Sequence, residues 1–209
     1  MKTFLNAISS LLAVGLLVAS SASFAIPTLK FGGNISYTTN ITSPADLNIS
    51  GVLIPGFQDL SIAPDLATSS VILSADFVSA SSADGNTTGL FGTTPANDLL
   101  ISDNFGLNTL LTGDVDSLML TGRDGTNLGI LVGTIEITGG LLAADFGGLG
   151  SLFAINFNLD TMFAPAMFDS DFFGITNGSI TAVVPEPMPL ALLSIALIGI
   201  TLTRKVYKR

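Results

Sequence analysis

The chain has 209 residues, of which 48% are hydrophobic and 11% charged, and it contains no Cys, His or Trp. The missing residue types exclude disulfides, thiolate nucleophiles, Ser-His-Asp triads and zinc sites built on Cys or on an HExxH motif. Because aliphatic residues are plentiful, the composition argues against intrinsic disorder and predicts a folded chain of one domain or two small ones.

The first 25 residues have the pattern of a secretory signal peptide. Lys2 supplies the positive start, residues 11–18 form an apolar core, and Ser23-Phe24-Ala25 places small residues at the cleavage positions. We therefore expect export, with cleavage after Ala25. The alternative is an N-terminal membrane anchor, which is disfavoured because the apolar run is shorter than the ~20 residues that a spanning helix needs.

Residues 26–184 are expected to form one all-β domain. Alternation of apolar and polar residues is clear at residues 131–138 and 153–159. The alternation predicts that Ile135, Ile137, Ile155 and Phe157 face the core and that Glu136, Asn156 and Asn158 face water or a polar groove. Further strands are predicted at residues 29–37, 47–54, 71–78, 98–102, 115–121 and 172–183. Turn signals separate them at residues 84–86, 124–126, 139–140, 147–148 and 177–178.

Many short strands joined by close turns favour a single antiparallel β-sandwich or jelly-roll-like fold of roughly eight to eleven strands. Glu, Lys and Gln, which favour helices, are scarce, and no stretch of the domain keeps a helical period. A β-solenoid is the alternative fold, but the sequence has no repeat of fixed length.

The domain is strongly acidic. Lys30 and Arg123 are its only cations against fifteen acidic residues, which gives residues 26–184 a net charge of −13. This balance argues against nucleic acid and anionic membrane surfaces as partners, and it suits solubility outside the cell. The free strand edges of a sandwich should pair only when salt or calcium screens this charge.

Carboxylates are the remaining candidates for chemistry. Asp114 and Asp116 flank one residue, so on a strand both side chains lie on one face, and Asp169 and Asp171 repeat this spacing. Two carboxyl groups several ångströms apart would suit a glycosidase. The pattern is more typical of a solvated acidic face, so we expect no enzyme and no catalytic residue.

A calcium site is an alternative role for Asp114, Asp116 and Asp124, whose oxygens are ligands of the right type. The segment from Asp124 to Asn127 lacks the spacing of an EF-hand loop and its closing Glu, and it also reads as an ordinary Asp-Gly turn. No other cofactor is expected.

Glycan binding is a further alternative. The domain has no Trp and only one tyrosine, Tyr37, so the aromatic platform of many sugar-binding modules is missing and contacts would come from Asp and Asn. Asn-x-Ser/Thr triplets, which arise often by chance in such a composition, begin at Asn34, Asn40, Asn48, Asn86 and Asn177.

The C-terminus carries three consecutive features. Pro185-Glu186-Pro187 is followed by an uncharged apolar stretch over residues 188–203 and then by a basic tail over residues 204–209. The order predicts a transmembrane helix with a cytoplasmic tail, in which the basic residues stop transfer. The stretch would span roughly 24 Å, short of a ~30 Å hydrocarbon core, which suits a temporary hold. The basic residues are Arg204, Lys205, Lys208 and Arg209.

This order resembles the PEP-CTERM sorting signal of exported bacterial proteins over residues 184–209. The resemblance implies recognition of Pro185, Glu186 and Pro187 by an exosortase, a membrane enzyme that uses a cysteine. It also implies cleavage near this motif and release to the cell surface or extracellular matrix, often together with exopolysaccharide. A tail-anchored surface protein with a proline-rich stalk is the alternative.

The sequence therefore predicts a non-enzymatic exported surface or extracellular-matrix protein, of the kind associated with biofilm or exopolysaccharide. The alternatives are a calcium- or glycan-binding module on the same export route and an aspartate-based hydrolase.

Overall fold

The computed structural model describes residues 27–39, 46–54, 69–95 and 97–183. The predicted signal peptide and the predicted C-terminal sorting signal lie outside these residues. The described chain forms antiparallel strands and one short 3-10 helix, η1, and no α-helix occurs within these ranges. The elements are β1 Thr28–Tyr37, β2 Leu47–Leu53, β3 Ser70–Ala83, β4 Asn86–Gly92, β5 Leu99–Ser102, β6 Thr109–Arg123, β7 Leu128–Gly139, β8 Leu152–Asp160, η1 Met167–Asp169 and β9 Phe172–Ala182.

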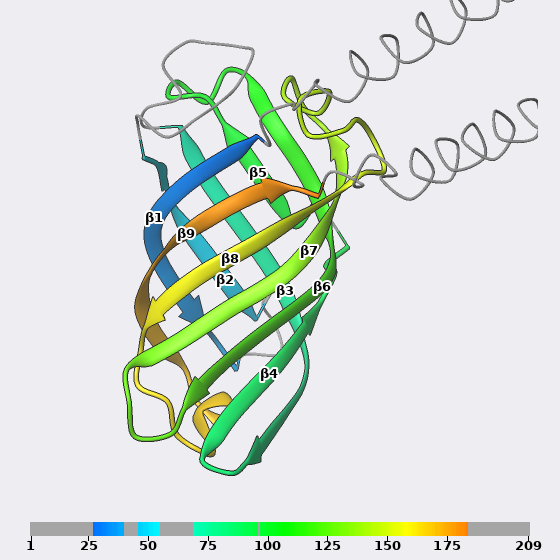
Figure 1. The fold of residues 1–209 in the computed structure, drawn as a ribbon. Coiled ribbons are helices and arrows are strands. Elements are labelled where there is room, and N and C mark those ends of the chain that lie inside the picture. The colour runs from blue at the N-terminus through cyan, green and yellow to red at the C-terminus, as the bar shows by residue number, and fades with distance from the viewer. Residues whose placement is uncertain (1–26, 40–45, 55–68, 96, 184–209) are drawn as a thin grey trace, which may run out of the picture.

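The strands form one closed barrel (Figure 1). The neighbours run β2-β1-β9-β8-β7-β6-β4-β3, and pairing of β2 with β3 closes the ring. The short β5 continues the strand position of β4, since both pair with β3 and β6 at different levels. The all-β prediction is confirmed, whereas the sandwich is wrong in detail: the sheet closes on itself instead of splitting into two packed sheets. Alternation along single strands is the same in both arrangements, so it did not distinguish them.

The alternating side chains face inward and outward as predicted. Ile135 and Ile155 are buried among the apolar side chains that fill the barrel, and so are Ile137 and Phe157. Glu136, Asn156 and Asn158 are exposed on the outer wall. The register Ile135 with Phe153 and Gly133 with Ile155 aligns the apolar rows of β7 and β8 across the interior.

The predicted turn at Asn177-Gly178 is wrong, because both residues lie inside β9. Gly178 pairs with Phe31 of β1 and with Phe157 of β8, whose ring centroids are 5.2 Å apart. A Cβ atom at Gly178 would come within 2.5 Å of the Phe157 ring. The glycine is therefore a packing position under the ring of Phe157, because a glycine in a strand lets a neighbouring side chain lie close to the backbone.

Chain segments cover both ends of the barrel. At the η1 end, which carries the turns at 84–85 and 124–127, the ring of Phe163 lies against Gly122 and Gly129 and that of Phe168 against Gly89. At the terminal end, where β1 starts and β9 ends, Leu142 and Phe146 of the loop over residues 140–151 are buried. The barrel is a packed core, so exposed groups for binding lie on its outer wall and at its ends.

Candidate functional site

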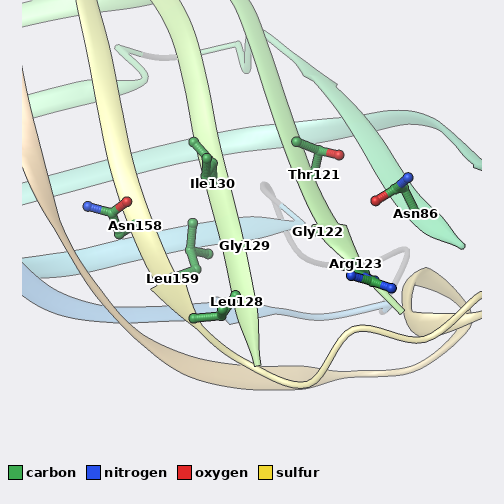
Figure 2. A pocket seen from close by; sticks show the side chains of 9 residues that line it. All are labelled: Asn86, Thr121, Gly122, Arg123, Leu128, Gly129, Ile130, Asn158 and Leu159. Atoms are coloured by element: carbon green, nitrogen blue, oxygen red, sulfur yellow. The ribbon is translucent and has the colours of Figure 1, made fainter. Parts of the chain in front are cut away.

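A shallow hollow of about 420 Å³ lies on the outer wall near the η1 end. Figure 2 shows Asn86 on β4, Thr121 and Arg123 on β6, Ile130 on β7 and Asn158 on β8 around it. The sheet register explains this gathering, since Thr121 pairs with Ile130 and Ile130 pairs with Asn158 across three neighbouring strands. The remaining lining residues are Gly122, Leu128, Gly129 and Leu159.

A second hollow of about 520 Å³ continues the first one toward β9. It shares Leu128, Asn158 and Leu159 with the first and adds Asn127, Asp160, Ile175 and Asn177. Asn158 pairs directly with Asn177, so their two side-chain amides lie side by side on the outer wall. Each amide group offers two donors and an acceptor. We call these two hollows together the amide band.

Arg123 is the exposed cation of the amide band. Its guanidinium forms no ion pair or hydrogen bond with the part of the chain that the structure describes. The band thus combines a free guanidinium, side-chain amides and the apolar side chains of Leu128, Ile130 and Ile175. Such a surface can hydrogen-bond a hydroxyl-rich ligand and pack against its carbon faces.

Asp114 and Asp116 both lie on the outer wall, as their spacing predicted, because Val115 between them is buried. A β-bulge between Val115 and Ser117 interrupts the register there. The hydroxyl of Thr134 donates to Asp116 at 2.7 Å. Asp114 Oδ1 is buried without a hydrogen-bond partner among the described residues, and Asp114 pairs with Glu136 on β7.

Asp124 lies at the η1 end. It is ten residues after Asp114, which corresponds to about 30 Å of extended strand. Its carboxylate accepts a hydrogen bond from the Thr87 hydroxyl at 2.6 Å. The structure therefore does not bring Asp114, Asp116 and Asp124 together. Within the described ranges no three acidic side chains form a group that could hold a metal ion, and the calcium site stays a prediction.

Asp169 and Asp171 lie at the η1 end, three strand positions around the ring from β6. Asp171 accepts hydrogen bonds from the backbone N–H of Thr39 at 2.8 Å and from its hydroxyl at 3.0 Å. These two bonds lower the pKa of Asp171 below its ordinary value. Asp171 thus fastens the end of β1 to the start of β9, and the two aspartate pairs do not share a cleft.

Sequence reasoning missed Asp98, the most buried acidic residue of the described chain at 1% exposure. Its carboxylate accepts hydrogen bonds from the N–H and hydroxyl of Thr94 at 2.7 and 2.6 Å and from the N–H of Val115 at 2.6 Å. It fixes the segment between β4 and β5 against β6. Nothing in its sequence neighbourhood distinguishes it from an exposed aspartate, and these contacts assign it a structural role.

The five Asn-x-Ser/Thr positions are scattered over the molecule. Asn34, Asn86 and Asn177 are exposed, Asn48 is half-buried and Asn40 lies outside the described residues. Asn34, Asn48 and Asn177 lie within strands and Asn86 begins one, so they do not form a common site.

Comparisons with protein-family models, with curated proteins and with solved structures found no match. In the described ranges no helix is long and apolar enough to cross a membrane. The residues of the predicted sorting signal and the predicted cleavage site at Ala25 lie outside those ranges.

Proposed function

We propose that this chain is a non-enzymatic exported protein of the cell surface or extracellular matrix, sorted by an exosortase through Pro185-Glu186-Pro187. The observation that carries the proposal is the order of motif, apolar stretch and basic tail in a chain with its own signal peptide. The prolines fix φ and disfavour helix, which suits an extended segment that an enzyme can grip.

Two features of the barrel agree with this role. Both described termini lie at one end, where the N–H of Ala182 donates to the carbonyl of Pro27 at 3.1 Å. The predicted sorting signal therefore begins directly after Val183, at the end of the barrel where both described termini lie. The net charge of −13 favours solubility once the domain is released.

The experiment compares two Glu→Ala variants in the producing cells. E186A should keep the protein in the membrane fraction, because it removes the carboxylate of the motif without touching the apolar stretch. E136A is the matched control, since Glu136 is the only other glutamate and is exposed on the barrel wall. The intact mass of released wild-type protein should correspond to a chain that starts near Ile26 and ends near residues 185–187. Normal release of E186A, or released protein that retains residues 190–209, would contradict the proposal.

Binding of a neutral exopolysaccharide is the second candidate function, and the amide band favours it. Calorimetry with the producer's own polysaccharide should give heat of binding that N158A removes. N156A is the control, because Asn156 is an exposed asparagine of the same strand that does not line either hollow. Equal binding by both variants would exclude the amide band as the site.

A further inference from the structure

Four large apolar side chains are strongly exposed at the terminal end of the barrel. Phe105 and Leu107 in the loop between β5 and β6 are 80% and 81% exposed, and Leu141 and Leu149 in the loop between β7 and β8 are 61% and 72% exposed. The two loops meet at their bases, where the N–H of Leu141 donates to the carbonyl of Thr109 at 3.2 Å. Exposed apolar residues are ordinary on a surface, and Leu128 and Phe173 are 75% and 67% exposed at the η1 end. What distinguishes these four is that they gather in two adjoining loops at the end where β9 leaves the barrel, which favours contact with something apolar there.

The loop that carries Phe105 and Leu107 is built around one carboxylate. Asp103 accepts hydrogen bonds from the N–H groups of Phe105 and Leu107 at 3.2 and 2.8 Å and from the side-chain amide of Asn108 at 2.5 Å. These bonds lower the pKa of Asp103. Since the backbone is held from within, the outward position of the two apolar side chains is a property of the folded loop.

The sequence that follows β9 indicates what the terminal end of the barrel faces in the precursor. The N–H of Val183 donates to the carbonyl of Leu152 at 3.2 Å, so β9 leaves the barrel beside the loop over residues 140–151 (Figure 1). Only residues 184–187 separate Val183 from the predicted membrane stretch at 188–203. Even fully extended, this connection reaches at most about 17 Å. In the anchored precursor the terminal end of the barrel therefore lies close to the bilayer surface.

We propose that the terminal end of the barrel docks on the bilayer in the anchored precursor, with Phe105 and Leu107 inserted into the lipid interface. The proposal rests on the proposed function, because the membrane stretch supplies the anchoring. Docking would hold residues 184–187 at the membrane surface, where a membrane enzyme can reach them. The domain has only Lys30 and Arg123 as cations, so the attraction is apolar, and zwitterionic lipid is the expected surface.

The absence of Trp from the chain makes a direct test available. The F105W variant of the chain with its C-terminal segment is reconstituted into phosphatidylcholine vesicles whose acyl chains carry bromine near the headgroup. F173W is the matched control, because Phe173 is 67% exposed and lies at the η1 end, where it pairs with Ser36. The F105W indole should lie about 5–10 Å below the headgroup boundary, shift its emission to the blue and lose about half of its intensity in brominated vesicles. F173W should show neither change.

The other possible outcomes separate a failure of the membrane anchoring from a failure of the docking. Flotation with the vesicles reports the membrane stretch independently of the indole. If the chain does not float, the anchoring fails and the docking fails with it. If it floats and F105W is not quenched, the docking alone is wrong. A blue shift without quenching by brominated lipid would mean that a second copy covers the loops. Circular dichroism of both variants should retain the β spectrum, and L107W provides a second reporter in case F105W does not fold.

Discussion

Gly178 shows how one residue can be read in two ways. As part of an Asn-Gly pair it indicates a turn, but in the structure it lies between β1 and β8 in the middle of the sheet, under the ring of Phe157. Glycine suits a turn because of its backbone freedom and a packed strand because it has no side chain. The sequence alone does not show which of these two properties is used at Gly178. Only the pairing partners on β1 and β8 decide between them.

Replacing Gly178 by alanine should destabilise the barrel by about 1–3 kcal/mol, the usual cost of overpacking. The added Cβ would collide with the backbone oxygen of Asn156 and meet the ring of Phe157. G32A is the control, since a Cβ there meets nothing closer than Ile54 at 3.5 Å, and it should change stability by no more than about 0.5 kcal/mol. Urea denaturation of residues 26–184 measures both, and equal effects would mean that the packing around Gly178 is misassigned.

Tyr37 is buried within a group of phenylalanines at the η1 end, and its hydroxyl donates to the carbonyl of Phe168 at 3.2 Å. Burial raises the pKa of Tyr37 above its ordinary value of 10.0, and the nearby carboxylates of Asp46, Asp169 and Asp171 raise it further. The folded state therefore holds the phenol proton more tightly than the unfolded state does. This contribution to stability is complete below pH 10 and is lost as the pH rises through the higher pKa of the folded protein.

The prediction for Tyr37 can be read directly, because it is the only tyrosine of residues 26–184. The ultraviolet absorbance of tyrosinate should report a pKa above 10 for Tyr37 in the folded domain and the ordinary pKa when the domain is unfolded in urea. In denaturation experiments the wild type should lose stability as the pH rises above 10, and Y37F should lose less. A folded-state titration at the ordinary pKa would show that the phenol is open to solvent.

At the scale of elements, the sequence predicts a strand well where alternation is uninterrupted and poorly where small residues break it. Residues 131–138 and 153–159 fall within β7 and β8. β4 was missed because Gly89, an inward position, has no apolar side chain; the ring of Phe168 occupies that space instead. The first half of β6 was missed because a bulge between Thr112 and Gly113 shifts its register.

The same limit applies to the candidate site. The exposure of Asn158 was predictable from its strand, but its position beside Asn177 depends on the register of β8 with β9. Arg123 could be singled out as one of two cations of the domain. That it stands among amides depends on the order of strands around the ring, which no local pattern encodes.

The hairpin between β3 and β4 depends on the backbone conformation of its two turn residues. Asp84 and Gly85 form its two-residue turn, with φ values of 52° and 73°. Two positive φ values are the mark of a type I′ turn, which matches the twist of the flanking strands. G85A should destabilise the domain by about 1–2 kcal/mol because alanine resists the left-handed conformation, although a Cβ there meets nothing within 4 Å.

The control for the hairpin is D84N, since asparagine adopts positive φ readily. It should leave the urea midpoint of residues 26–184 unchanged, while G85A lowers it. If G85A matches the wild type, the turn adopts another geometry in solution.

At the scale of the whole molecule, closure of the barrel removes the strand edges that the acidic charge was expected to keep from pairing. In an open sandwich, the net charge of −13 would keep unpaired strand edges apart, and calcium or salt would let them associate. In the barrel each of the eight strand positions has a hydrogen-bonded neighbour on both sides, including the position that β4 and β5 share. The described sheet has no open edge to pair.

We therefore expect residues 26–184 to remain monomeric when calcium is added. Light scattering should be the same in CaCl2 and in NaCl of equal ionic strength, because both salts only screen a diffuse negative charge. The informative contrary result is scattering that rises in calcium alone. It would indicate a specific calcium site, and Asp114 is the residue to test, because its buried Oδ1 has no hydrogen-bond partner among the residues that the structure describes. In that case D114N combined with D116N should abolish the calcium response, whereas D171N should not, since Asp171 is already bonded to Thr39.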